Sequence, residues 1–198
     1  MSQIKLKHSG GNGVIIAAPN SNPAADRTIT LPDLTANATM ATVNGIQEFD
    51  VWYLTGNNSS NGDITSNLSR YTSTSAAAAS PLGTGMSQSS GIFSFPSTGK
   101  YLVICNPIFQ LKDFDNANIQ TMVTTNNSSY TEHAIALDGN NGSGSRGGSG
   151  TSFAFVDVTD TSNVKVKFLL GSLGTDSYLV GSSTVIYSSF VFVRIGDT

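Results

Sequence analysis

The stretch Gly91-Ile-Phe-Ser-Phe-Pro-Ser-Thr-Gly-Lys-Tyr101 decides the fold. Phe93 belongs to a short apolar segment that suits a strand facing a core. Pro96 fixes its own φ and Gly99 permits the chain to reverse, so a turn follows that segment. Tyr101 then starts an apolar run of the kind found in central strands. The stretch therefore predicts a strand, a turn and a second strand.

Segments of the same character recur along the whole chain. They are rich in Val, Ile, Thr, Tyr and Phe and are bounded by Gly, Asn, Ser and Pro, whereas almost nothing has helical periodicity. The expected strands are residues 3–7, 14–18, 28–31, 49–55, 91–95, 100–110, 119–125, 132–138, 152–158, 164–170 and 185–195. This pattern predicts an all-β protein built as a two-sheet β-sandwich or jelly roll.

The chain divides into a short first part and a main domain. Residues 1–45 form a small β-rich segment that is too short to bury a core of its own, so we expect it to lean on another surface. Residues 46–198 form the main domain. Two low-complexity segments interrupt that domain, at 73–80 and 138–150, and we expect the second to be a flexible loop without packing capacity.

Composition excludes several classes of function. Charged residues make up 12% of the chain and the net charge is −3, so there is no basic footprint for nucleic acid. No apolar run approaches the roughly 20 residues that span a bilayer, and we expect neither membrane insertion nor a signal peptide. The single cysteine, Cys105, lies in an apolar run and is interpreted as a small core residue.

Signatures of catalysis and metal binding are scarce. His8 is interpreted as a surface residue and His133 as a surface or interface residue, and no nucleophile elbow, phosphate loop or zinc spacing occurs. Asp113, Asp115 and Asn116 offer oxygen ligands for calcium, but their spacing does not match an EF-hand and a solvated turn is the preferred interpretation. We therefore predict no enzyme activity, no cofactor and no metal.

The quoted stretch resembles the strand-turn-strand signature of the tumour-necrosis-factor-like superfamily, which includes the globular head of complement component one-q. The segment from Ser182 to Phe192 is similar to that superfamily's final strand. Ser162-Asn163 stands where the family usually has Gly-Asp. The resemblance covers residues 46–198 and implies a jelly roll and compact homotrimers, joined through aromatic and aliphatic residues on one sheet.

A second resemblance concerns the surroundings of this domain. Ile4 to Gly11, Arg27 to Asp33 and Met86 to Pro96 are similar to segments of bacteriophage tail-fibre and appendage proteins. This implies a virion structural protein, either a trimeric fibre or a capsid-decoration subunit, whose partners are other phage structural proteins. The residues expected to dock on the particle are the apolar ones of the first part: Ile4, Leu6, Ile15, Ile16, Ile29 and Leu31.

Two further surfaces are predicted from the aromatic residues, because aromatics bring large contact areas to interfaces. The last strand is apolar in both of its alternating sets except at Arg194, so we expect a neighbouring subunit to cover one face. The residues predicted for the trimer interface are Tyr101, Val103, Phe190 and Phe192. Trp52 and Tyr53 are the candidates for binding a host surface carbohydrate, against an interpretation as an ordinary entry strand.

Two other functions stay open at this point. The first is a secreted or surface ligand-binding module of the same superfamily. The second is a polysaccharide-degrading tailspike, which would need paired carboxylates in a long groove, and this chain offers none that convinces. The sequence does not distinguish head decoration from tail fibre, and it does not identify a receptor.

Overall fold

A computed structural model describes residues 3–7, 10–11, 13–17, 45–72 and 81–198. The chain divides into two compact units, Met1–Thr42 and Val43–Thr198, and each is considered by itself. All regular structure in the described residues is β-strand. None of those residues forms a helix of the length and apolarity that crossing a bilayer requires.

The described part of the first unit is one hairpin. Strands β1 (Gln3–Lys7) and β2 (Gly13–Ala17) pair antiparallel, with Ile4 opposite Ile16 and Leu6 opposite Val14. The predicted strand at 3–7 is confirmed and the one at 14–18 is shifted by one residue. The predicted strand at 28–31 lies outside the described residues.

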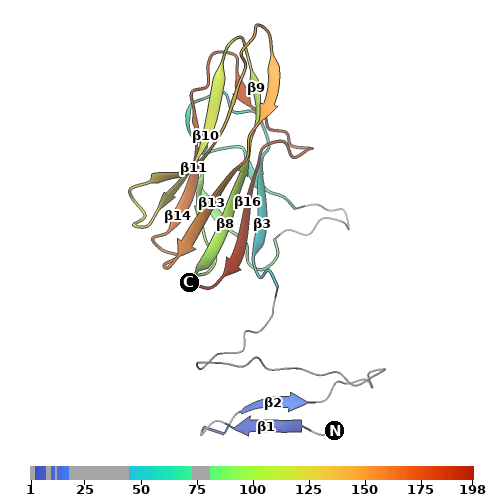
Figure 1. Cartoon of the computed structure of the whole chain (residues 1–198), viewed down its shortest axis with the longest axis vertical. Coiled ribbons are helices and arrows are strands. Elements are labelled where there is room, and N and C mark those ends of the chain that lie inside the picture. The colour runs from blue at the N-terminus through green and yellow to red at the C-terminus, as the bar shows by residue number, and fades with distance from the viewer. Residues whose placement is uncertain (1–2, 8–9, 12, 18–44, 73–80) are drawn as a thin grey trace, which may run out of the picture. The chain divides into compact units, whose positions relative to one another are not determined.

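The second unit is a sandwich of antiparallel sheets (Figure 1). One sheet has five strands, in the order β13 (Ser152–Val158), β8 (Gly99–Asn106), β16 (Ser189–Gly196), β3 (Phe49–Leu54) and β5 (Leu68–Arg70). Figure 1 shows β13, β8, β16 and β3 side by side in that order. The final strand of the chain therefore lies in the middle of its sheet, between β8 and β3.

The opposing sheet has six strands. Its path is β11 (Thr131–Gly139), β10 (Asn116–Thr124), β14 (Lys165–Gly171), β7 (Ile92–Ser94) and β6 (Ser87–Ser89), and β4 (Gly62–Asp63) also pairs with β14. A smaller three-stranded sheet extends the sandwich at one end, in the order β12 (Arg146–Ser149), β9 (Ile108–Leu111) and β15 (Tyr178–Leu179). Its strand β9 lies at the top of Figure 1.

An aromatic cluster fills the space between the two large sheets. Phe93 of β7 is fully buried and its ring lies 5.3 Å from Trp52, 5.8 Å from Phe168 and 5.1 Å from Phe192. Phe168 stacks on Phe190 at 4.2 Å. Such pairs add about 0.5–1.5 kcal/mol each beyond the apolar area that they bury. The stretch that predicted the fold thus supplies the central ring of the core.

The predicted turn after Phe93 is confirmed. Gly99 has a φ of +142°, and a side chain there would collide with Arg194, so the close approach of β16 requires glycine. The expected strand at 100–110 is interrupted at Pro107, which has no N–H for the ladder and separates β8 from β9.

The prediction of a flexible loop without packing capacity at 138–150 is wrong for residues 146–149. Residues Arg146–Ser149 form strand β12, which pairs with β9. Its composition of small residues gives no strand signal, and the pairing comes from the neighbouring backbone. The alanine-rich segment at 73–80 lies outside the described residues.

Candidate functional site

Strands β8 and β13 of the five-stranded sheet alternate strictly between the core and the outside. Along β8, Tyr101, Val103 and Cys105 are fully buried, whereas Leu102 and Ile104 point to the other side of the sheet. The four residues predicted for the trimer interface, Tyr101, Val103, Phe190 and Phe192, all belong to the buried set. The structure therefore places them inside the sandwich, where the opposing sheet covers them. The surface open to a neighbour carries the alternate residues of the same strands.

These alternate residues form a continuous apolar surface, which we call the outer face. The register places Phe155 opposite Leu102, Phe153 opposite Ile104, and Ile104 opposite Val191. Phe153 is 57% exposed and Phe155 is 70% exposed, values that are unusual for phenylalanine in regular structure. The members of the outer face are Val51, Tyr53, Leu102, Ile104, Phe153, Phe155 and Val191, together with Val193, which is buried.

Polar residues bound this face at both ends. Lys100 stands opposite Asp157 at one end of the β8–β13 pair. At the other end the Thr151 hydroxyl donates to the Asn106 side chain at 3.0 Å. An apolar centre between polar ends is the usual anatomy of a protein–protein interface.

The outward side of the six-stranded sheet is much more polar. Lys167 of β14 bonds to Asp63 at 2.7 Å and lies 4.4 Å above the ring of Tyr130. Lys165 donates to the Ser94 hydroxyl at 2.8 Å. The part of this side around β14 is therefore suited to contact with water.

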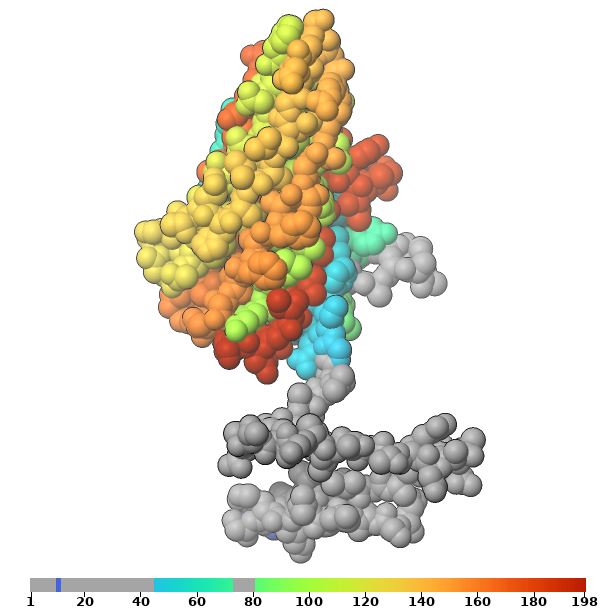
Figure 2. Space-filling model, in the orientation of Figure 1, coloured from blue at the N-terminus to red at the C-terminus, as the bar shows by residue number. Residues whose placement is uncertain are grey.

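A second exposed apolar pair lies next to β13, on the edge strand β11. Ile135 and Leu137 point outward, and Leu137 is 64% exposed. Strands β11 and β13 are in contact although they belong to different sheets. Figure 2 shows the yellow residues of β11 beside the orange residues of β13 on one surface.

The carbohydrate candidates Trp52 and Tyr53 point to opposite sides of β3, as neighbours in a strand must. Trp52 packs against the core, and its indole N–H donates to Asp50 at 2.8 Å. Asp50 is 1% exposed and also accepts from Arg70 at 3.0 Å and from the Met86 N–H at 2.7 Å. Tyr53 lies on the outer face. The two rings cannot form one platform for a sugar.

The predicted docking residues are only partly described. Ile4 and Leu6 lie on β1, and Ile15 and Ile16 lie on β2. The register pairs Ile4 with Ile16. The remaining two, Ile29 and Leu31, fall outside the described residues.

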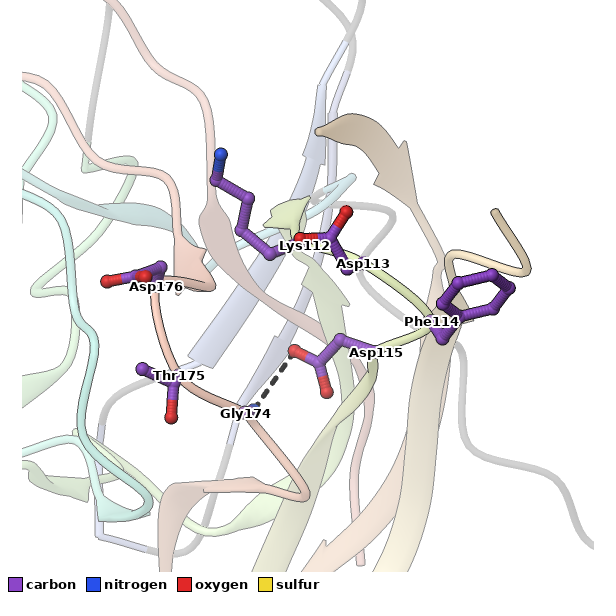
Figure 3. Close-up of a pocket in the computed structure, with 7 residues that line it drawn as sticks. All are labelled: Lys112, Asp113, Phe114, Asp115, Gly174, Thr175 and Asp176. Carbon is purple, nitrogen blue, oxygen red and sulfur yellow. Dashed lines mark hydrogen bonds between the residues drawn. The ribbon is translucent and has the colours of Figure 1, made fainter. Parts of the chain in front are cut away.

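The structure also contains an open hollow of about 390 Å³ between two loops. The loops contribute Lys112, Asp113, Phe114 and Asp115 on one side, and residues 174–176 on the other. Figure 3 shows Asp115 reaching across to Gly174, whose N–H donates to it at 3.0 Å. Asp113 accepts from the Gly144 N–H. Asp113 and Asp115, two of the candidate calcium ligands, thus stabilise loops. No group of three His, Cys, Asp or Glu side chains suited to a metal occurs in the described part of the chain.

Burial makes two ionisable side chains inert. Desolvation raises the pKa of the fully buried Cys105 thiol far above its ordinary value. Burial also raises the pKa of Tyr101, whose hydroxyl donates to the Ser97 carbonyl at 3.1 Å. His133, at the start of β11, is exposed. Cys105 and Tyr101 lie in the core, whereas perturbed groups that act in catalysis lie in a cleft.

The exposed phenylalanines were not identified from the sequence, although the sequence carries a signal for them. Asp157 alternates in phase with Phe153 and Phe155, so all three must point to the same side of β13. Lys100 is in phase with Leu102 and Ile104 in the same way. In β13 and β8 the charged residue at the end of the apolar set therefore marks the side that faces away from the core.

Comparison with known proteins identifies the fold. No family model matches the chain, and no curated protein is detectably similar to it in sequence. Among solved structures, Eiger TNF from S. frugiperda is similar with a TM-score of 0.58 and 16% identity over 76% of this chain and 93% of that one. Murine APRIL at pH 5.0 is similar with a TM-score of 0.55 and 10% identity over 75% of this chain and 98% of that one. The predicted all-β jelly roll is confirmed, and the chain has a tumour-necrosis-factor-like fold.

Proposed function

We propose that this chain is a non-enzymatic structural module that assembles as a homotrimer through its outer face. The observation that carries the proposal is the apolar outer side of the five-stranded sheet, with Phe153 and Phe155 largely in water. Exposed apolar patches of this kind mark association surfaces, because burying them is favourable by about 25 cal/mol per Å².

The exposed apolar residues favour a closed ring over a simple dimer. The outer face belongs to the five-stranded sheet, and the Ile135–Leu137 pair lies beside it on edge strand β11 of the other sheet. When different surfaces of identical copies meet head to tail, the assembly closes as a ring if the rotation permits. A trimer is the small ring that the resemblance to the superfamily implies.

The oligomeric state of the purified full-length chain tests this proposal. We expect light scattering to give three times the chain mass at micromolar concentration, with a β-type circular dichroism spectrum. A folded monomer under these conditions would overturn it.

Within this assembly we further propose a place in a bacteriophage virion, as a fibre or capsid-decoration subunit. The first unit would dock on other phage structural proteins, and the second would be displayed. The proposal is supported by the division of the chain into two units and by the phage-like segments of the sequence. Mixing particles that lack the subunit with the full chain or with residues 43–198 tests it. We expect only the full chain to join particles, and equal incorporation of both would contradict docking through the first unit.

The alternative is a secreted or surface ligand-binding module with the same fold. It is favoured by the structural similarity to Eiger TNF, because that similarity covers 76% of this chain and 93% of that one. The same truncation separates the two ideas. A ligand-binding module keeps its binding, for instance to an array of host polysaccharides, when residues 1–42 are removed.

A further inference from the structure

Four Asn-Gly dipeptides occur in the chain, and two of them, Asn61-Gly62 and Asn141-Gly142, lie wholly within the described residues. The dipeptide is chemically reactive because glycine has no Cβ to hinder its backbone nitrogen. That nitrogen attacks the side-chain carbonyl carbon of the preceding Asn and expels ammonia, which leaves a five-membered succinimide. Water then opens the ring to aspartate or isoaspartate.

The surroundings of Asn61 protect it from this reaction. Its Nδ2 donates to the Leu173 carbonyl at 2.9 Å, and its Oδ1 accepts from the Leu173 N–H at 2.9 Å. Gly62 is held in β4, opposite Leu170. Both side-chain bonds must break before the amide carbon can turn toward the Gly62 nitrogen.

Asn141 has no such protection. Its side chain is exposed and makes no hydrogen bond, in a turn between β11 and β12. The Gly142 nitrogen makes a single bond, to the Asn140 side chain at 3.1 Å. Only that contact has to be released before the nitrogen can attack.

The same turn supports one wall of the hollow in Figure 3. The Gly142 carbonyl accepts from the Phe114 N–H at 3.0 Å, and the Gly144 N–H donates to Asp113. Isoaspartate at Asn141 would insert an extra backbone atom immediately before Gly142. It would also add a negative charge near Asp113, taking the formal net charge from −3 to −4.

From these contacts we propose that Asn141-Gly142 is a site of spontaneous deamidation, and that the modification loosens the loop that carries Phe114. The asymmetry between the two dipeptides arises from the fold, because both have the same local sequence chemistry. It is independent of the oligomeric state and of any partner.

Peptide mapping by mass spectrometry tests this on the full-length protein kept in mildly alkaline buffer. We expect Asn61 to deamidate at least about fivefold more slowly than Asn141, since two side-chain hydrogen bonds must break at Asn61 and only one contact must be released at Gly142. In denaturant the two rates should become similar. Equal rates at the two sites in the folded protein would overturn the proposal. It would also be overturned if Asn141 stayed intact in the folded protein over a time in which it deamidates in denatured protein.

Gly142→Ala is the matched control. It keeps Asn141 but places a methyl group beside the attacking nitrogen, and that methyl meets only Asn140 Oδ1, at 3.8 Å. We expect slower loss of ammonia at Asn141 and an unchanged rate at Asn61. An unchanged rate at Asn141 would exclude attack by the Gly142 nitrogen.

Discussion

Substitution of Phe155 by Asp is the most direct test of assembly through the outer face. Phe155 is 70% exposed in the single chain. The accessible surface of a phenylalanine is about 200 Å², so about 140 Å² can be buried on association. At about 25 cal/mol per Å² this is worth about 3.5 kcal/mol per copy, or about 10 kcal/mol in a trimer. These values are upper bounds, because part of each ring stays in water at the edge of a contact.

The expected effect on assembly follows from that energy. A loss of about 10 kcal/mol raises the trimer dissociation constant by about seven orders of magnitude. Because this constant has units of concentration squared, the concentration at half-dissociation rises by its square root, about three orders of magnitude. Sedimentation velocity from nanomolar to high micromolar protein measures this shift. Circular dichroism should show an unchanged fold, since the side chain contributes little to the core.

Phe114→Asp is the control for this substitution. Phe114 is 71% exposed, almost the same as Phe155, but it lies in the loop before β10. Its φ of 55° is one that Asp tolerates well. We expect this variant to assemble like the parent chain. If both variants stay trimeric, or if both dissociate, the outer face is not the surface that joins the copies.

Three further predictions concern the folded chain. Asp50→Ala should lower the free energy of unfolding in urea by about 3–5 kcal/mol, since it leaves Arg70 and two N–H groups without their acceptor. Adding Arg70→Ala should cost less than the sum of the single changes, and full additivity would contradict the coupling. Phe93→Ala should cost about 3–5 kcal/mol, measured in the same way, because it removes the central ring of the core. Cys105 should react with a thiol reagent only after unfolding, and fast labelling of folded protein would contradict its burial. Because its pKa is raised in the fold, Cys105 contributes stability that is lost as pH rises above the ordinary thiol pKa, where only the unfolded chain ionises.

The fold was predictable because its main elements carry local signals that agree with each other. Residues 164–168 alternate as Val-Lys-Val-Lys-Phe, and strand β14 appears at Lys165–Gly171. The short strands β4 and β15 have two residues each, and β12 consists of Arg, Gly and Ser. Such strands form because an adjacent backbone offers hydrogen bonds. Their own residues carry no strand signal from which they could be predicted.

The contact surface was harder to predict than the fold because the sequence of β16 suggests the wrong orientation for its alternating residues. Arg194 alternates with Phe190 and Phe192, which suggests that all three face water. A bulge between Arg194 and Gly196 interrupts the ladder at this point. The guanidinium there donates to the Thr98 carbonyl at 3.0 Å and pairs with Asp197, at the end of the sheet where the core stops. Arg194 therefore alternates in phase with the buried Phe190 and Phe192 but lies beyond the end of the core.

The central strand β8 links the fold to the assembly. The run from Tyr101 to Cys105 is apolar at every position, so both sides of this strand exclude water. The six-stranded sheet covers only the side that carries Tyr101, Val103 and Cys105. Leu102 and Ile104 are left half-buried beside the exposed Phe153 and Phe155, and no described residue of the second unit covers these two phenylalanines. A strand that is apolar on both sides needs a cover on each side, and in the proposed homotrimer the second cover of β8 is another copy of the chain.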